Sequence, residues 1–396
     1  MASDSHSSEG GRPPVVLQVL PALQTGGVER GTIDIAEAIV EAGGQALVAS
    51  EGGRMMHELA RIGATHIELP LRSKNPWVMM RNIGRLRALI DAHGVDIVHA
   101  RSRAPAWSAY FACRKTDAAF VTTFHGTYNR NVPFKTLYNS VMTRGQRVIA
   151  ISNFIADHME QVYKVERRRI RVVHRGIDIE LFDPRHIPAA RVIKLANQWR
   201  LPDDVRVVML PARVTRWKGQ ALLIEALSRI DTEGLRCLIV GDEQGRTGYK
   251  RELERLVERL GLGAVVHMVG DCADMPAAYM LADVVVSAST DPEAFGRVMV
   301  EAQAVGKPVV AAAHGASAEL VLPDETAWLF EPDNVEALAA TLDGVLRLDT
   351  GARETLAERA IANVRANFTK EQMCAKTLEV YSEVLTEAAA RAYGRS

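Results

Sequence analysis

The stretch VRVVMLPARVTRWKGQALLIEALSRIDTEGLRCLIVG, residues 205–241, decides the fold, because it contains a strand, a helix and a second strand in succession. Val205–Pro211 and Leu235–Gly241 are almost continuously apolar, which is typical of strands covered on both faces. Between them, Gly219–Arg229 has the apolar spacing of a helix, and two parallel strands need such a crossover. We therefore expect a parallel sheet with helices on both faces.

The same alternation runs along the chain in two series. Further strands are expected at residues 14–20, 46–50, 96–100, 120–124, 147–152, 170–173, 265–268, 284–287 and 308–311. The series meet near Phe182–Pro188, which holds two prolines and no periodicity. The expected fold class is α/β, with two doubly wound, Rossmann-like domains facing an interdomain cleft. The expected divisions are a disordered tail (1–13), a first domain (14–187), a second domain (188–368) and a C-terminal helix (369–396).

The composition argues against several classes of protein. Apolar residues make up 47% of the 396 residues and charged residues 24%, values typical of a soluble globular protein. The 48 basic and 48 acidic side chains balance, so no overall positive field favours a nucleic acid as partner. The four cysteines lack metal-ligand spacing, which argues against zinc and against a disulfide framework. No apolar run reaches the roughly 18 residues of a membrane span, and no signal-peptide pattern is present, so we expect a cytoplasmic location.

The most informative motif is SASTDPEAFGRVMVEA, residues 287–302, which passes from a strand through a loop into a helix. If the helix starts near Phe295, Glu293 precedes it and Glu301 lies within it. Unpaired backbone N–H groups at such a helix start favour a diphosphate. The two carboxylates would then meet hydroxyl groups on either side, those of a sugar and of a ribose. Taken alone, both are equally compatible with ordinary helix-start and surface carboxylates.

Two glycine-containing loops follow other strands. PARVTRWKG, residues 211–219, places Arg213 and Lys218 where their charges would offset a diphosphate, although a solvated loop has the same composition. TGGVE, residues 25–29, is a Gly26-Gly27 turn in which backbone N–H groups can approach a phosphate. It lacks the full dinucleotide fingerprint, and on its own it is equally a structural turn.

Two more strand ends carry polar side chains in the first half of the chain. HARSR, residues 99–103, holds Arg101 and Arg103, and TFHG, residues 123–126, places His125 before a glycine. A histidine at a strand end is well placed to meet a substrate hydroxyl. It is also commonly a structural residue, and the spacing alone does not decide between the two.

The ordered set of motifs resembles glycosyltransferase family 4, whose members are retaining enzymes of the GT-B fold. The motifs that carry the resemblance, between about residues 15 and 385, are GGVE (26–29), DIVHA (96–100), TFHG (123–126), VIAIS (148–152), RGIDIELF (175–182), ARVTRWKG (212–219), Glu293 and Glu301 with EAFG, and GKPVVA (306–311). The resemblance implies a nucleotide-sugar donor on the second domain and an acceptor on the first. It also implies that the C-terminal helix returns to the first domain.

The resemblance carries roles to individual residues. The implied donor-binding residues are Gly27, Arg213, Lys218, Glu293, Ala294, Phe295, Gly296 and Glu301, and the implied catalytic residues are His125, Glu293, Arg213 and Lys218. On the acceptor side we expect Gly26, Arg101 and Arg103. Glu301 is implied to bind the ribose, and Glu293 the transferred sugar.

The chain departs from the family pattern at Arg175, where an asparagine is usual before Gly176. There is no DxD motif, so we expect neither a metal nor another cofactor, with Arg213 and Lys218 stabilising the leaving diphosphate. The resemblance implies a same-face reaction in which the leaving phosphate receives the acceptor proton. Two other interpretations remain open, a nucleotide-sugar epimerase and a non-catalytic nucleotide-sugar-binding subunit. A phosphorylase would need a lysine-bound pyridoxal phosphate, and no lysine in the sequence has a suitable context.

The first half of the chain, on which the acceptor is expected, is basic. Residues 1–190 contain 24 Lys and Arg against 18 Asp and Glu, a net charge of +6. The basic side chains include Arg72, Lys74, Arg101, Arg103, Arg130 and Lys135. They favour an anionic glycan or glycolipid acceptor, or contact with the inner face of the cell membrane, to which the apolar Trp77–Met80 would add. Solvated surface charge explains them equally. Our working expectation is lipopolysaccharide or exopolysaccharide biosynthesis, with a UDP- or GDP-linked donor.

Overall fold

The computed structural model of the chain describes residues 12–24, 26–128, 134–245 and 247–393. Contacts divide the protein into two compact units. The first unit contains the residues up to 173 except 152–154, together with those from 373 onward; the second contains 152–154 and 174–372. The residues 1–11 of the expected tail, together with Thr25 and Arg130, lie outside the described part.

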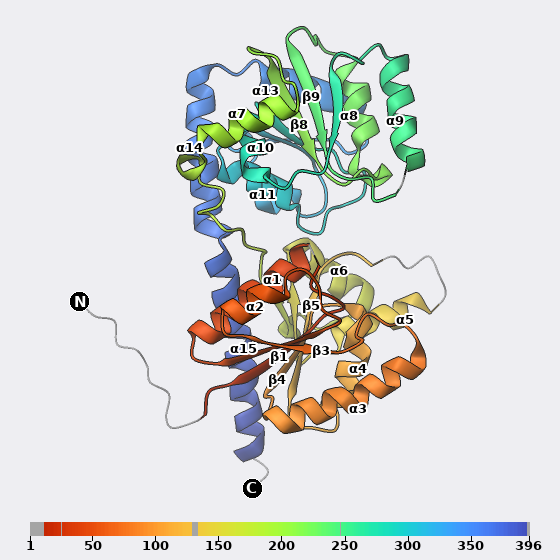
Figure 1. Ribbon diagram of the computed structural model, residues 1–396, viewed down its shortest axis with the longest axis vertical. Helices are drawn as coiled ribbons and strands as arrows, with labels where there is room; N and C mark the ends of the chain where they lie inside the picture. Colours follow the sequence, from red (N-terminus) through yellow and green to blue (C-terminus); the bar gives the residue numbers. More distant parts are fainter. Residues whose placement is uncertain (1–11, 25, 129–133, 246, 394–396) are drawn as a thin grey trace, which may run out of the picture. The chain divides into compact units, whose positions relative to one another are not determined.

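The first unit is built on a parallel sheet with the strand order β3-β2-β1-β4-β5-β6-β7, with helices on both faces (Figure 1). Its strands are β1 (Val15–Val19), β2 (Gln45–Ser50), β3 (Thr65–Glu68), β4 (Ile97–Ala100), β5 (Ala119–Phe124), β6 (Arg147–Ala150) and β7 (Ile170–Val172). The helices of this part of the chain are α1 (Gly27–Glu41), α2 (Met56–Arg61), α3 (Pro76–His93), α4 (Arg103–Cys113), α5 (Lys135–Asn139) and α6 (Asn153–Tyr163). The central strand β1 pairs on both sides, with Val16 opposite Ala46 and Ile97. Its five residues are all buried, as expected of a strand inside a doubly covered sheet.

The second unit is built on a parallel sheet with the order β10-β9-β8-β11-β12-β13. Its strands are β8 (Arg206–Pro211), β9 (Leu235–Val240), β10 (Val266–Gly270), β11 (Val284–Ser287), β12 (Val309–Ala312) and β13 (Ala327–Phe330). Its helices are α7 (Ala189–Gln198), α8 (Gln220–Leu227), α9 (Thr247–Arg259), α10 (Met275–Leu281), α11 (Arg297–Ala304), α12 (Ser317–Leu320), α13 (Val335–Leu346) and α14 (Thr350–Asn367). In both sheets the strand order reverses beside the first strand, as in a Rossmann fold, which confirms the expected α/β class.

Three local features differ from the sequence-based expectations. The apolar spacing predicts a helix over residues 81–93 with Trp77–Met80 ahead of it, but α3 begins at Pro76. The reason is that the Asn75 side chain accepts a hydrogen bond from the Trp77 N–H and that proline suits the first turn. Trp77 and Met80 therefore lie in α3 rather than ahead of it. Helix α11 begins at Arg297 rather than near Phe295, because the preceding glycine adopts a left-handed conformation. The division between the units falls at 173/174, whereas the sequence analysis placed it at 187/188.

Helix α15 (Lys370–Tyr393) packs on the first unit from residue 373 onward. Its Tyr381 is buried and contacts His99 on β4, and its Glu383 forms ion pairs with Arg147 and Arg171. Cys374 lies against the carbonyl of Asp34 on α1. This long helix therefore joins strands and helices of the first unit through both its buried and its charged side chains. None of the described helices is both long and apolar enough to cross a membrane.

Candidate functional site

The candidate residues of the second unit follow β8 and β11, the two neighbouring strands beside which the strand order reverses. Val284 of β11 pairs with Val208 of β8, so the loops after both strands leave the same edge of the sheet. In open parallel sheets, ligands bind at this edge beside the reversal point. The 212–219 and 288–296 loops are therefore brought together by the topology.

Lys218 and Glu293, 75 residues apart, form an ion pair between these two loops. The Lys218 Nζ donates to Glu293 Oε1 at 2.6 Å, and each side chain is only 13% exposed. The Ser289 hydroxyl donates to the same carboxylate oxygen at 2.5 Å. The Thr290 N–H donates to the Trp217 carbonyl at 2.8 Å and ties the two loops at the backbone. The Glu293 carboxylate is thus held in one orientation at the sheet edge.

Two glycines allow this close approach. Gly219 has φ +72°, and a Cβ there would lie 1.7 Å from the Ala288 carbonyl oxygen. Gly315 has φ +64°, and a Cβ there would lie 2.5 Å from the Glu293 carbonyl oxygen. A side chain at either position would force apart the backbone segments that hold Lys218 and Glu293.

Glu301 lies one turn into α11 and is buried, with 9% of the residue exposed. Its Oε2 accepts a hydrogen bond from the Tyr279 hydroxyl at 2.9 Å, and its Oε1 forms an ion pair with Arg297 at 2.8 Å. Burial and the nearby carboxylate raise the pKa of Tyr279 well above its usual value, so its hydroxyl remains a donor. The Glu301 side chain is therefore held at both carboxylate oxygens.

The start of α11 differs in detail from the sequence expectation. Gly296 is the N-cap with φ +82°, and Phe295 precedes the helix with its side chain buried against the rings of His174 and Phe368. The Ala294 carbonyl accepts a hydrogen bond from the Ser152 hydroxyl at 2.6 Å. The positive end of the helix therefore starts at Arg297, between the two carboxylates in sequence.

Arg213 follows β8 and is exposed. Its backbone carbonyl accepts a hydrogen bond from Gln220, but among the described residues its guanidinium forms no ion pair. The structure thus joins Lys218 to Glu293 and leaves the Arg213 side chain exposed on the same loop. An exposed guanidinium on this edge is accessible to an anionic ligand.

The candidates of the first unit surround the corresponding reversal point, between β1 and β4. Gly26, with φ +153°, caps α1, and a Cβ there would lie 2.5 Å from a Glu29 carboxylate oxygen. Gly27 is the first residue of α1. Arg101 follows β4 and is 4% exposed, so burial lowers its pKa, while nearby Tyr381 and Asp34 oppose that shift.

Arg103 and His125 lie at the same edge of the first sheet. Arg103 begins α4, donates to the Asn139 side chain at 2.9 Å and lies 4.1 Å from the centre of the Tyr128 ring. His125 directly follows β5, the strand beside β4, and is half-buried. Parallel strands end at one edge, so the first unit gathers Gly26, Arg101, Arg103 and His125 there.

Sequence reasoning missed three side chains that shape the second unit's edge. Ser289 lies in the same motif as Glu293, and its position two residues after β11 was an available signal. Tyr279 is 22 residues before Glu301, and no local pattern connects them. His314 follows β12, and its ring nitrogen lies 2.7 Å from the Ser289 carbonyl. Only the packed structure brings Tyr279 and His314 to these partners.

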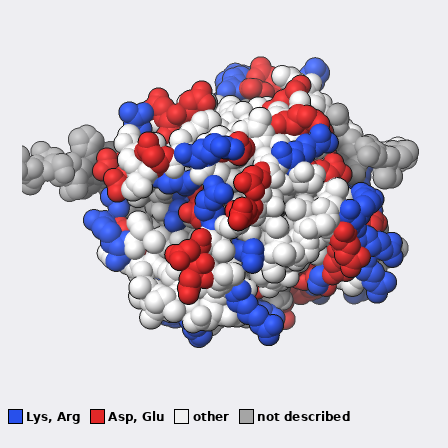
Figure 2. Space-filling model, turned by 90° about the horizontal axis from the view of Figure 1, so that it is seen from above, with Lys and Arg blue, Asp and Glu red and all other residues white. Residues whose placement is uncertain are grey.

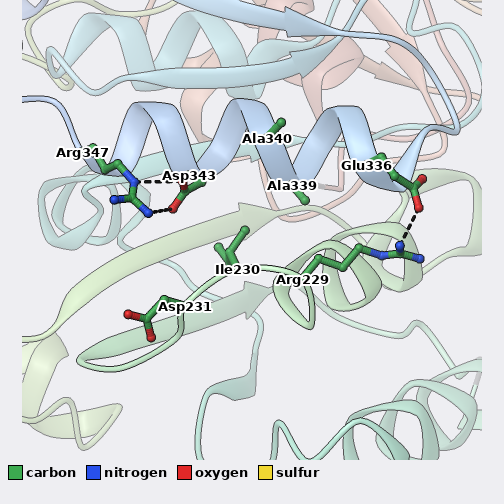
Figure 3. A pocket seen from close by; sticks show the side chains of 8 residues that line it. All are labelled: Arg229, Ile230, Asp231, Glu336, Ala339, Ala340, Asp343 and Arg347. Carbon is green, nitrogen blue, oxygen red and sulfur yellow. Dashed lines mark hydrogen bonds and ion pairs between the residues drawn. The ribbon is translucent and has the colours of Figure 1, made fainter.

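A separate pocket of about 370 Å³ lies between α13 and the turn after α8 (Figure 3). Arg229 pairs there with Glu336, and Arg347 with Asp343. The turn, residues 229–231, precedes β9, so the pocket lies at the opposite edge of the sheet from Lys218 and Glu293. Its guanidiniums are already neutralised by carboxylates, and it contains none of the predicted site residues.

The surface charges are mixed on the face drawn in Figure 2, where Lys and Arg side chains alternate with Asp and Glu. A surface that binds nucleic acid typically carries a continuous patch or stripe of Lys and Arg, which differs from the mixed charges of this face. Among the described residues, no cluster of three or more His, Cys, Asp or Glu side chains is arranged to hold a metal ion.

Comparisons with known proteins give matches over most of the chain. The model of Glycosyltransferase Family 4 matches residues 25–181, and that of Glycosyl transferases group 1 matches residues 192–365. A D-inositol 3-phosphate glycosyltransferase of Xylanimonas cellulosilytica is 30% identical over 319 residues, which are 75% of this chain and 74% of that protein.

Solved structures are similar over nearly the whole chain. The crystal structure of a glycosyltransferase from Rickettsia africae ESF-5 has a TM-score of 0.87 and 38% identity, over 95% of this chain and 99% of that one. Anabaena Alr3699/HepE in complex with UDP and glucose has a TM-score of 0.80 and 26% identity, over 93% of this chain and 100% of that one. The same Anabaena protein has been solved with UDP-glucose.

Proposed function

The chain belongs to glycosyltransferase family 4, and from this we propose that it transfers a sugar from a UDP-sugar to a hydroxyl group of a glycan or glycolipid, with retention of configuration and without a metal or other cofactor. The observation that carries the proposal is the arrangement at the edge of the second sheet. There Lys218 holds Glu293 at 2.6 Å on one side of the α11 start, and a buried Glu301 lies on the other.

These groups match the parts of a nucleotide sugar. Glu301 accepts hydrogen bonds from the ribose hydroxyls, and Glu293 accepts them from the transferred sugar. Lys218, Arg213 and the N–H groups near Gly296 stabilise the diphosphate between them. We take uracil as the base because the Anabaena relative, 26% identical, binds UDP and UDP-glucose.

The reaction requires charge to develop on the diphosphate. The bond between the anomeric carbon and the phosphate oxygen breaks, and its electron pair stays on the UDP. The acceptor oxygen bonds to the anomeric carbon on the same face, and its proton passes to the leaving phosphate oxygen. Lys218, Arg213 and the helix start stabilise the developing charge, which is the usual role of such groups in group transfer.

Glu293 has a positioning role on the sugar rather than a covalent one. One of its oxygens already accepts from both Lys218 and Ser289, which reduces its strength as a nucleophile. Glu293→Gln therefore lowers turnover at least tenfold and leaves UDP affinity within about threefold of the wild type. A large loss of UDP affinity in this variant contradicts the assignment. UDP-sugar consumption without any acceptor would instead favour an epimerase.

The acceptor binds to the first unit. Gly26, Gly27, Arg101, Arg103 and His125 surround its strand reversal point, where a ligand is expected. Two arginines there favour an acceptor with an anionic group, and His125 meets the reacting hydroxyl. We place the reaction in lipopolysaccharide or exopolysaccharide assembly, whose intermediates combine sugars with phosphate or lipid. UDP release on adding lipid-linked glycans, and its absence with neutral free sugars, tests this part.

We further propose that a face of the first unit formed by α3, α4 and α5 contacts the anionic inner surface of the cell membrane. On α3, Trp77 is 75% exposed and Met80, one turn later, is 62% exposed. Phe134 before α5 is 84% exposed, and Leu137 is 59% exposed. Both helices are tied to α4: Ser108 donates to the Met79 carbonyl, and the Trp107 indole to the Tyr138 carbonyl.

The charged residues near these apolar side chains in the sequence are almost all positive. No Asp or Glu occurs between residues 69 and 90, and Asp117 is the single acidic residue between 97 and 156. Arg72, Lys74 and Arg81 are exposed at the start of α3. Aromatic side chains beside uncompensated basic ones are typical of surfaces that dock on anionic bilayers.

Co-sedimentation with vesicles of 70% phosphatidylcholine and 30% phosphatidylglycerol tests this contact. We expect binding that weakens at high salt and falls at least tenfold in a Trp77→Ala, Phe134→Ala double variant. Ile193→Ala is the matched control, because Ile193 on α7 is 59% exposed in the second unit. No binding of the wild type, or equal loss in the control, refutes the contact without affecting the proposed reaction.

A further inference from the structure

Tyr279 is a buried side chain whose polar end meets one of the proposed donor-binding carboxylates. It lies on α10 with no exposed surface, and its ring packs 6.1 Å from that of Phe182. Its hydroxyl donates to Glu301 Oε2 at 2.9 Å. A buried tyrosine hydroxyl needs a hydrogen-bond partner, and here that partner is the carboxylate itself.

The other carboxylate oxygen of Glu301 is held independently. Arg297, one turn earlier on α11, forms an ion pair with Oε1 at 2.8 Å. With a hydrogen bond at one oxygen and an ion pair at the other, the carboxylate is held from both sides. A carboxylate oxygen has about two acceptor sites, so each oxygen of Glu301 can accept one more hydrogen bond. Two adjacent acceptors in a fixed plane match the two hydroxyls of a vicinal diol.

A largely buried carboxylate such as Glu301 contributes little to the stability of the fold, which argues against a purely structural role. Removing a carboxylate from water is unfavourable, and apolar side chains of similar size usually stabilise a protein core at least as well as a buried ion pair. The Glu301 side chain is 12% exposed, so the pair is not wholly enclosed and a ligand can still reach it. Tyr279 is neutral, so it orients the carboxylate without cancelling the charge that a diol hydroxyl would meet.

We propose that Tyr279 is a positioning residue: its hydroxyl orients Glu301 for the two ribose hydroxyls of the donor, and so gives the protein its preference for ribonucleotides over deoxyribonucleotides. This rests on the proposed function, in which Glu301 binds the ribose. Without the Tyr279 hydroxyl, only Arg297 holds the carboxylate, which turns toward the guanidinium and away from the diol. The loss is largest for ligands that carry both hydroxyls, because these need both oxygens in place.

The test compares the affinities of UDP and 2′-deoxy-UDP, measured by titration calorimetry. We expect the wild type to bind UDP at least tenfold more tightly than 2′-deoxy-UDP. In Tyr279→Phe this ratio falls to threefold or less, while the 2′-deoxy-UDP affinity stays within twofold of the wild type. Tyr249→Phe is the matched control, because Tyr249 is a largely buried tyrosine of the same unit, on α9, with Arg216 4.9 Å from its ring centre. It should keep the full ratio.

Two results overturn the proposal: equal weakening of both ligands in Tyr279→Phe, which indicates a structural role alone, or an unchanged ratio. If Tyr279→Phe does not fold, Arg297→Met removes the other anchor from a side chain that is 35% exposed, and it should also reduce the ratio. An unchanged ratio there overturns the proposal as well. If the wild type binds no UDP, the proposed function itself fails; if it binds UDP without discrimination, only the positioning proposal fails.

Discussion

Lowering the pH from 7.5 to 5.5 should destabilise the first unit through one buried imidazole, that of His99 on β4. Its Nδ1 lies 2.6 Å from the Tyr381 hydroxyl and its Nε2 2.7 Å from that of Thr123, and it has no exposed surface. Burial, with a smaller effect from the positive charge of Arg101, lowers the pKa of His99 well below 6.5. The native protein therefore keeps this imidazole neutral.

The magnitude follows from proton linkage. The unfolded chain binds a proton at His99 below about pH 6.5, whereas the folded chain does not, so the folded state loses stability as the pH falls. Because the native pKa lies well below 6.5, the loss between pH 7.5 and 5.5 has an upper limit of about 1.4 kcal/mol, or about tenfold in the unfolding equilibrium. The contribution is fully present above pH 7.5.

Hydrogen exchange of the β1 and β4 amides measures this free energy within the first unit, after correction for the intrinsic effect of pH on exchange. His99→Gln, which does not titrate, should be less stable at pH 7.5, but its stability should depend less on pH, by up to about 1.4 kcal/mol. His93→Gln, at an exposed position of α3, is the control for replacing a histidine of the same unit. Equal pH dependence in the wild type and His99→Gln refutes the reasoning.

Two further predictions concern the second unit. Gly219→Ala should lower the free energy of unfolding by about 3 kcal/mol or more, because a Cβ meets the Ala288 carbonyl oxygen at 1.7 Å; urea unfolding that matches the wild type contradicts this. Arg185 holds the pKa of the buried Asp183 carboxyl well below its usual range, so its stabilisation is present above about pH 4 and is lost as the pH falls. Asp183→Asn should therefore cost about 2 kcal/mol at pH 7 and clearly less at pH 2, as urea unfolding at both pH values can check.

Much of the fold follows from the sequence because buried parallel strands are nearly continuous apolar runs. Strands such as β8 and β9 are predicted almost residue for residue. The edge strand β13 has only four residues, too few to establish a period. Helix α14 has its apolar residues scattered around the helix, and its start depends on an N-cap at Asp349. Elements that depend on neighbours for burial leave the weakest local pattern.

The candidate site also contains some residues that the sequence predicts and others that it does not. Strand-end loops predict Lys218 and Glu293, and the sheet order brings them to 2.6 Å. The start of α11 is displaced because Gly296 takes a left-handed conformation that composition does not reveal. Tyr279 has no local signal, because its contact with Glu301 depends on how α10 packs on α11. Residues such as Lys218 and Glu293, which follow strands directly, can thus be predicted from their spacing in the sequence. Residues such as Tyr279, which orient them from another element, cannot.

Thermal unfolding with UDP, GDP and ADP tests the central claim most directly, that a UDP-sugar is bound and used by the second unit. A nucleotide present at 100 times its Kd stabilises the folded protein by about 2.7 kcal/mol. We predict this stabilisation with UDP, a much smaller effect with GDP and ADP, and its loss in Glu301→Gln. Stabilisation by none of the three, or by UDP equally in Glu301→Gln, would contradict the account.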